Sequence, residues 1–211
     1  CPRYAWAMQA DPELLMAWRA GDQQAGLELF ERYYPNLSRF FRSKVSDGWA
    51  DLVQSTFLAC AAGKDRIRGD AGFRQYLFSV AYKQLISHYR RRARDQDKLE
   101  FAEVSAADLD PSPSALTAAQ QELELLLRAL RRIPLDAQII LELHYWENMT
   151  THECALALEL PHSTAKWRLR RARELVKQKM HELAESPGLA KSTIDGFERW
   201  AEALREQMPT G

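Results

Sequence analysis

The stretch from Thr150 to Met180 constrains the fold of this chain more than any other feature. Its sequence, TTHECALALELPHSTAKWRLRRARELVKQKM, opens with a capping box, because Glu153 follows Thr150 by three residues. Pro161 then ends one helix and can occupy the first turn of the next, since its ring fixes φ and removes a backbone donor. Two helices joined this tightly predict a helix-turn-helix.

The second of these helices has two chemically different faces. Small or apolar residues fall at helical spacing on one narrow side, the side that a small domain buries: Ala165, Leu169, Ala172 and Val176. Between Lys166 and Lys179 there are seven basic residues and one acid. A helix this positive, with its apolar stripe turned inward, is typical of one that offers its other face to phosphates and base edges. A solvated charged face is the alternative interpretation.

Composition places the chain among globular proteins of one or two domains, because it has 211 residues and is 46% hydrophobic. Its 29 basic and 29 acidic residues cancel, so only local charge can indicate partners. The segment 83–94 holds five bases and no acid, whereas the segment 99–127 holds six acids and neither Lys nor Arg. Such segregation indicates surfaces with different roles.

The three cysteines, Cys1, Cys60 and Cys154, show no metal-ligand spacing, and their odd number argues against a disulfide framework. We therefore expect a reduced, cytoplasmic setting, no metal and no other cofactor. No apolar run approaches the length of a membrane span, and no basic region followed by an apolar core opens the chain. We expect no membrane partner. The chain begins with Cys1 instead of Met, so the sequence leaves open whether Cys1 is the native start.

Helical periodicity recurs in most of the chain, and no stretch alternates convincingly as a strand does. Ahead of the helix-turn-helix, N-cap residues (Asp11, Asp22, Asp136) and apolar spacing predict helices over 11–21, 22–41, 51–62, 73–94, 116–132 and 136–146. The polar, glycine-punctuated segment 64–72 is predicted to be a loop, and the Asp-, Ser- and Pro-rich segment 95–115 a linker.

A further helix is predicted after a break at Ser186-Pro187-Gly188. Its apolar face consists of Ile194, Phe197, Ala201, Leu204 and Met208, with Trp200 beside them. Packing on the second domain is the interpretation that we favour, and a regulatory appendage is the alternative. We predict an all-α protein with two small helical domains joined by a flexible linker. The second is a helix-turn-helix (winged-helix-like four-helix) domain, and an extra C-terminal helix follows it.

The order of these motifs resembles a known family, the bacterial extracytoplasmic-function (ECF, group IV) sigma factors of RNA polymerase. AGDQQAGLELFERYYPNLSRFFRSKV resembles the family's opening helices, and DLVQSTFL its core-polymerase-binding helix. FRQYLFSVAYKQLISHYRRR is similar to the promoter-melting helix, LRRIPLDAQIILELHYWENMT to the lead-in of the second DNA-binding domain, and STAKWRLRRAREL to its recognition helix. The resemblance covers about residues 11–182, and several motifs in one order are more specific than any single motif.

The resemblance implies a dissociable polymerase subunit that is no enzyme itself and that recognises and melts promoter DNA. It implies sigma domain 2 over 11–94, a linker over 95–115, sigma domain 4 over 116–182 and a C-terminal extension over 183–211. Core polymerase would bind through the clamp of its largest subunit and the flap of its second. The residues implied to bind the core are Asp51, Gln54 and Phe57.

Two groups of residues are implied to contact DNA. For the minus-ten element, captured as an opened single strand by charge and stacking, they are Arg66, Arg68, Phe73, Arg74, Tyr76, Lys83, Ser87, Arg90 and Arg91. For the minus-thirty-five element they are Ser163, Thr164, Lys166, Trp167, Arg168, Arg170 and Arg171. Arg170 and Arg171 are the better candidates for base contacts, because a guanidinium can bond a guanine edge with two hydrogen bonds, worth about 1 to 3 kcal/mol of discrimination.

The chain departs from the family pattern in its core-binding helix. Gly48, Trp49 and Ala50 stand where the family has acids, and Ser55 stands where a glutamate is common. Phosphorylation of Ser55 or Thr56 by a Ser/Thr kinase would restore about 1.5 to 2 negative charges, so we hypothesise such a switch. An anti-sigma factor is the alternative regulator.

Four more positions depart from the family pattern. Lys83 and Ser87 replace a common Asn and Asp in the melting helix, and Glu159 replaces a frequent turn glycine. Trp167 replaces a small polar residue in the recognition helix. It could contact thymine methyl groups, or it could pack on a neighbour such as the C-terminal helix.

Two other classes of function compete with the sigma-factor interpretation. The first is a one-component helix-turn-helix regulator that does not bind core polymerase, which a binding experiment would distinguish. The second is an enzyme such as a nuclease, for which the sequence offers no glycine-rich phosphate loop and no cluster of acids with metal-ligand spacing. His144, His152 and Cys154 are close in sequence, but His144 and His152 are predicted to lie on different helices.

Overall fold

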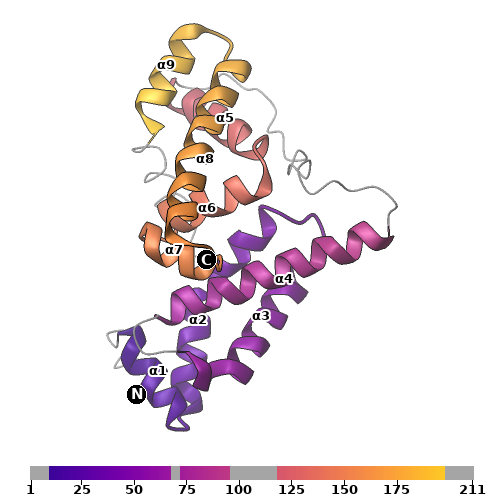
Figure 1. The fold of residues 1–211 in the computed structure, drawn as a ribbon, viewed down its shortest axis with the longest axis vertical. Coiled ribbons are helices and arrows are strands. Elements are labelled where there is room, and N and C mark those ends of the chain that lie inside the picture. Colours follow the sequence, from indigo (N-terminus) through magenta and orange to yellow (C-terminus); the bar gives the residue numbers. More distant parts are fainter. Residues whose placement is uncertain (1–9, 68–71, 96–117, 198–211) are drawn as a thin grey trace. The chain divides into compact units, whose positions relative to one another are not determined.

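The computed structural model describes residues 10–67, 72–95 and 118–197, and every regular element in these residues is a helix (Figure 1). The chain divides into two compact units, the first made by residues up to Arg91 and the second by most residues from Arg92 onward. The predicted all-α fold class is therefore confirmed. The segment 96–117, which holds nearly all of the predicted linker, lies outside the described residues.

The helices of the first unit are α1 (Asp11–Arg19), α2 (Gln23–Arg42), α3 (Trp49–Gly63), a 3-10 turn (Lys64–Arg66) and α4 (Phe73–Asp95). Asp22 caps α2 as predicted, because its Oδ1 accepts hydrogen bonds from the backbone nitrogens of Gln24 (2.9 Å) and Ala25 (3.3 Å). Pro35 lies inside α2 without ending it.

The core of the first unit is aromatic. Its largest fully buried side chains include Phe40 and Phe41 of α2 and Phe73 and Phe78 of α4. The rings of Phe40 and Phe78 meet edge to face at 5.6 Å, a favoured geometry for aromatic pairs. Farther along α4, the hydroxyl of Tyr89 donates a hydrogen bond to the carbonyl of Lys44, beyond the end of α2. Both contacts hold α4 against α2.

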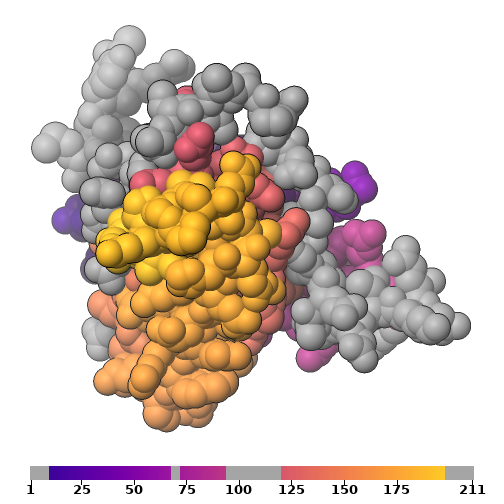
Figure 2. All heavy atoms as spheres, turned by 90° about the horizontal axis from the view of Figure 1, so that it is seen from above, coloured from indigo at the N-terminus to yellow at the C-terminus, as the bar shows by residue number. Residues whose placement is uncertain are grey.

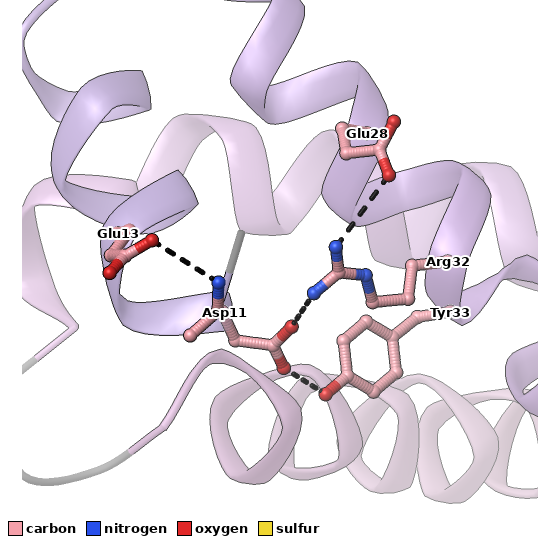
Figure 3. A network of polar contacts seen from close by, with 6 residues as sticks. Asp11, Glu13, Glu28, Arg32 and Tyr33 are labelled. Atoms are coloured by element: carbon pink, nitrogen blue, oxygen red, sulfur yellow. Dashed lines mark hydrogen bonds and ion pairs between the residues drawn. The ribbon is translucent and has the colours of Figure 1, made fainter. Parts of the chain in front are cut away.

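The prediction that Asp11 is an N-cap was wrong. The N-cap of α1 is Ala10, whose backbone nitrogen donates to Glu13 Oε2 at 3.3 Å, and Asp11 is the first helical residue. Figure 3 shows what the Asp11 carboxylate does instead: one oxygen lies 2.6 Å from Arg32 Nη1, and the other accepts from the Tyr33 hydroxyl. Glu28 also pairs with Arg32 at 3.6 Å. The carboxylate therefore fastens α1 to α2.

The second unit contains α5 (Ala118–Arg131), α6 (Leu135–Tyr145), α7 (Thr151–Ala157), α8 (His162–Leu183) and α9 (Pro187–Asp195). The long helix α8 is its centre and contacts α5, α6 and α9. A second cap prediction was also wrong: Pro134 is the N-cap of α6, and Asp136 lies within the first turn.

Helix α9 begins earlier than the sequence predicts. Ser186 is its N-cap, with Oγ accepting from Leu189 N at 3.2 Å, and Pro187 is already helical. The predicted break is thus also a helix start. Figure 2 shows α9 (yellow) lying against α8 (orange), and Ala190, Thr193 and Phe197 are buried. Packing on the second unit is what the favoured interpretation required. Trp200, Ala201, Leu204 and Met208 lie outside the described residues.

Candidate nucleic-acid and polymerase interface

The helix-turn-helix forms where the sequence predicts it. Thr150 and Glu153 form the capping box of α7: the Thr150 backbone nitrogen donates to Glu153 Oε2 at 2.7 Å, and Glu153 N donates to Thr150 Oγ1 at 3.2 Å. The turn that follows contains Glu159 with a left-handed φ of 54°. Pro161 is the N-cap of α8. The short connection therefore depends on one non-glycine residue in a conformation that favours glycine.

The two faces of α8 are those that the sequence predicts. Its buried residues are Ala165, Leu169, Ala172, Val176 and Met180. The exposed residues of the opposite face follow helical spacing: Ser163, Lys166, Trp167, Arg170, Arg171 and Glu174. All of these except Glu174 are predicted contacts to the minus-thirty-five element. Trp167 stands out, because 65% of its surface is exposed.

Two residues of α8 that were predicted to contact DNA, Thr164 and Arg168, are only partly exposed. Arg168 has 22% of its side chain exposed, and its Nε lies 3.7 Å from Asp136 Oδ2 on α6. Its guanidinium thus pairs within the domain, and its contact with DNA stays a prediction. Thr164 is half-buried. The reason is helical geometry, since Arg168 lies beside Leu169 on the border of the buried stripe.

A polar chain behind the exposed face fastens α8 to α6. Arg173 Nε donates to the Tyr145 hydroxyl at 2.8 Å, and its guanidinium lies 5.4 Å from the centre of that ring. Arg173 Nη2 also lies 3.4 Å from His144 Nε2. His144 Nδ1 lies 2.8 Å from the carbonyl oxygen of Met149, which can only accept, so Nδ1 carries the hydrogen. Sequence reasoning missed this support, because nothing in the spacing links residues 28 positions apart.

In the first unit, the predicted melting helix α4 presents an exposed basic face. Lys83, Ser87, Arg90 and Arg91 are all exposed and recur at intervals of three and four residues. Arg66, in the 3-10 turn before α4, is also exposed. The exposure that these predicted minus-ten contacts require is therefore present.

Three other predicted minus-ten contacts have different surroundings. Phe73 is 1% exposed, and its ring meets those of Tyr33 (5.5 Å) and Trp18 (6.2 Å) edge to face. It cannot stack on a base, so this prediction was wrong, and its place on the apolar face of the helix fits the core instead. Tyr76 and Arg74 are half-buried. Arg68 lies outside the described residues.

Helix α3 carries an exposed stripe at helical spacing. Asp51 and Gln54, both predicted to bind core polymerase, are exposed, and Leu58 continues the stripe with 64% of its surface exposed. Phe57 is different: it is half-buried, and its ring stacks on that of Phe30 at 4.4 Å. Phe57 was predicted to bind core polymerase, but its ring packs within the first unit. Sequence reasoning missed Leu58, whose position four residues after Gln54 could have indicated it.

The two predicted phosphorylation sites are not equivalent. Thr56 is 0% exposed, and its Oγ1 donates to the Leu52 carbonyl at 2.6 Å. A kinase could not reach this hydroxyl in the folded protein, so the structure argues against Thr56. Ser55 is half-buried and donates to the same carbonyl at 3.1 Å.

The shifted titratable groups mark the core and the helix surface. Burial raises the pKa of the Cys60 thiol to about 12, and burial together with the Asp11 carboxylate raises the pKa of the Tyr33 hydroxyl far above its usual range. Hydrogen bonds from Lys179 and Gln178 lower the pKa of Glu182.

Among the described residues no three His, Cys, Asp or Glu side chains are grouped to hold a metal ion. None of the helices in this part of the chain has the length and apolarity to cross a membrane.

Each of the two units matches a family model of a sigma-70 region. The family model for sigma-70 region 2 matches residues 29–95, and the model for sigma-70, region 4 matches residues 123–176. The ECF RNA polymerase sigma-E factor of Escherichia coli (strain K12) is 26% identical over 182 residues, which are 82% of this chain and 95% of that protein. The ECF RNA polymerase sigma factor SigM of Mycobacterium tuberculosis is 29% identical over 169 residues, or 78% and 82% of the two chains.

Solved structures show the same fold. CnrH in complex with the cytosolic domain of CnrY matches with a TM-score of 0.60 and 22% identity, over 83% of this chain and 100% of that one. The sigma factor RpoE in complex with the anti-sigma factor NepR from Bartonella quintana matches with a TM-score of 0.56 and 21% identity, over 77% and 99%.

Proposed function

Because the chain belongs to the extracytoplasmic-function family of RNA polymerase sigma factors, we propose a division of its promoter-recognition work between named helices. As a sigma factor it binds core polymerase and directs promoter recognition, DNA melting and transcription initiation. We assign core binding and the minus-ten element to residues 11–94, and the minus-thirty-five element to residues 116–182. The catalysis of RNA synthesis belongs to the polymerase.

Helix α8 contacts the minus-thirty-five element with its exposed face. The observation that carries this proposal is the separation of its two sides: an apolar stripe buried in the domain, and Lys166, Arg170 and Arg171 exposed opposite it. A helix of this kind fits the major groove of DNA, where arginine bonds guanine edges and lysine neutralises phosphates. Arg173, held by Tyr145, and Arg168, paired with Asp136, support the helix from behind.

Helix α4 contacts the minus-ten element after the strands open. Its exposed face carries Lys83, Arg90 and Arg91, which supply the positive charge that a single strand requires. Tyr76, half-buried, is the aromatic candidate for stacking. Since Lys83 and Ser87 replace the residues common in the family, we expect a minus-ten preference that differs from that of typical relatives.

Helix α3 binds the clamp of the largest polymerase subunit through Asp51 and Gln54. Leu58 lies exposed on the same stripe and adds apolar contact area. Few negative charges open this helix, so docking onto a basic surface is weakened in the unmodified protein. Phosphorylation of Ser55 by a Ser/Thr kinase, or an anti-sigma factor of the kind bound to RpoE in the solved complex, are the regulators that we consider. All of these steps take place in the cytoplasm, where polymerase works.

The first experiment measures binding of purified, unmodified protein to core RNA polymerase. We expect binding that weakens when Asp51 and Gln54 are both changed to Ala, and no change for Glu31→Ala, an exposed acid on α2 that serves as the matched control. DNA binding without any binding to core polymerase would instead favour the one-component regulator.

A second comparison tests the phosphorylation proposal. Ser55→Glu adds one negative charge to the α3 stripe, and Ser55→Ala adds none. Tighter binding to core polymerase by the Glu variant alone supports phosphorylation as the switch. Equal binding by all three proteins refutes it and directs attention to an anti-sigma factor.

A further inference from the structure

Trp167 is more exposed than any other tryptophan that the structure describes. Trp18 and Trp146 are 4% and 8% exposed, whereas Trp167 is 65% exposed. An indole is among the largest apolar surfaces that a side chain can bury, so leaving one in water forgoes stabilisation. Such a ring in the middle of a functional face indicates a partner that covers it.

The neighbours of Trp167 indicate the chemistry of that partner. Lys166 precedes it, and Arg170 and Arg171 follow one helical turn later on the same exposed face. The partner must therefore be anionic around an apolar spot. Duplex DNA has this combination in the major groove, because the 5-methyl group of thymine is the apolar group displayed there among phosphates and polar base edges.

The place of Trp167 along α8 favours DNA over an acidic protein. It is the sixth residue of a helix that starts at His162, in the N-terminal half that helix-turn-helix proteins direct at base edges. The alternative of packing on the C-terminal helix does not hold for α9, which buries Ala190 and Thr193 while Trp167 stays exposed.

We propose that Trp167 is a specificity-determining residue that selects thymine in the minus-thirty-five element through contact with its 5-methyl group. The inference rests on the proposed function of α8. One helical turn of about 5.4 Å separates Trp167 from Arg170 and Arg171, which corresponds to about one or two base pairs at 3.4 Å each. The selected thymine therefore lies within about two base pairs of a guanine bonded by one of these arginines.

The test uses holoenzyme reconstituted from core RNA polymerase and the full chain. Bound duplexes are first selected from a randomised library to define the minus-thirty-five element. Each thymine of that element is then replaced singly by uracil, which removes only the methyl group. We expect one replacement to weaken binding by wild-type holoenzyme about fourfold, the effect of one buried carbon.

Variants assign the effect to the tryptophan. Trp167→Ser should bind the thymine and uracil duplexes equally, and Trp167→Phe should keep part of the preference, because its ring is smaller but still apolar. Tyr34→Ser, which removes an exposed aromatic from α2, should behave as wild type. The side chain of Trp167 is exposed, so these changes leave the core of the domain intact.

Other results of the binding experiments would contradict either the role of Trp167 or the proposed function of α8. Equal binding of every uracil duplex by wild-type holoenzyme overturns the role of Trp167 and leaves the proposed function of α8 standing. A uracil effect that persists unchanged in Trp167→Ser does the same, because another residue then contacts the methyl group. Failure to select any minus-thirty-five element overturns the proposed function of α8 and this inference together.

Discussion

Glu159 shows how one residue limits the stability of the helix-turn-helix. Its φ of 54° lies in the left-handed region, where a Cβ atom approaches the following carbonyl oxygen at a cost of about 1 kcal/mol or more. Its side chain is exposed, so little packing compensates for this strain. The position is one where the family frequently has glycine, and the backbone conformation gives the physical reason.

Glu159→Gly is therefore expected to raise the free energy of unfolding by about 0.5 to 1 kcal/mol, because glycine adopts this conformation without the Cβ penalty. Urea denaturation of the purified chain measures the effect. Glu159→Ala is the matched control, since it removes the same carboxylate but keeps Cβ, and it should show no such gain. Equal stabilisation by both variants would assign the effect to charge instead of backbone strain.

Cys60 provides a second prediction at this scale, based on its buried thiol. Its pKa is raised from 9.0 to about 12 in the folded chain. Between these values the unfolded state loses the thiol proton and the native state keeps it, so stability falls as pH rises. The fall due to this group amounts to about 1.4 kcal/mol per pH unit.

Stability measured by denaturant between about pH 9.5 and 11 should thus decline more steeply for wild type than for Cys60→Ala. The comparison concerns slopes, so the loss of packing in the variant does not affect it. Below pH 8 the two slopes should coincide. Parallel curves throughout the alkaline range would contradict burial as the state of this thiol.

At the scale of elements, the attachment of α8 to α6 decides how firmly the exposed basic face is held. The Tyr145 hydroxyl accepts from Arg173 Nε at 2.8 Å, and the Tyr145 ring meets that of Phe197 edge to face at 5.4 Å. The same ring thus contacts the recognition helix and the segment after α9. By this contact the described part of the C-terminal extension, residues 183–197, packs within the second unit.

Tyr145→Phe keeps the ring and removes the hydroxyl, which leaves a half-buried guanidinium without one of its acceptors. We expect a loss of about 1.5 to 3 kcal/mol in the free energy of unfolding of the second unit, the usual range for a hydrogen bond to a charged group. Tyr34→Phe, an exposed tyrosine on α2, is the control and should change stability by less than about 0.5 kcal/mol. Hydrogen exchange resolved by helix can locate the loss in α6 and α8, and an unchanged exchange rate there would count against the attachment.

At the scale of the whole molecule, 29 basic and 29 acidic residues cancel, so affinity for DNA cannot come from net charge. It must come from faces on which one sign is concentrated, such as the exposed side of α8. Lys166 on that side is the candidate for a phosphate contact, because lysine acts as a point charge without the two-pronged geometry that base edges favour.

Lys166→Gln should weaken binding of the holoenzyme to promoter DNA to a similar extent for all minus-thirty-five sequences. It should also reduce the slope of log K against log salt by about 0.9, the value for one released counterion. Lys191→Gln, an exposed lysine on α9, is the matched control and should leave the slope unchanged. A sequence-dependent loss with an unchanged slope would assign Lys166 to base contact instead.

Local sequence patterns were enough to predict much of the fold. The capping box at Thr150, the proline at 161 and the apolar stripe of α8 each act within one or two helical turns, so the sequence alone was enough to locate the helix-turn-helix and to separate its two faces. The same holds for Asp22, whose cap involves only the next three residues. The family and the all-α class followed from the order of such local motifs.

Tertiary structure decided the contacts between residues far apart in the chain, since helical periodicity does not tell which other helix a face meets. Asp11 appeared to be a cap, but Arg32 and Tyr33 of α2 bind its carboxylate. Phe73 was predicted to stack on a base, yet rings from α1 and α2 pack against it. Trp167 could have packed or remained exposed, and only the folded chain, in which α9 buries other residues, shows that its ring is exposed.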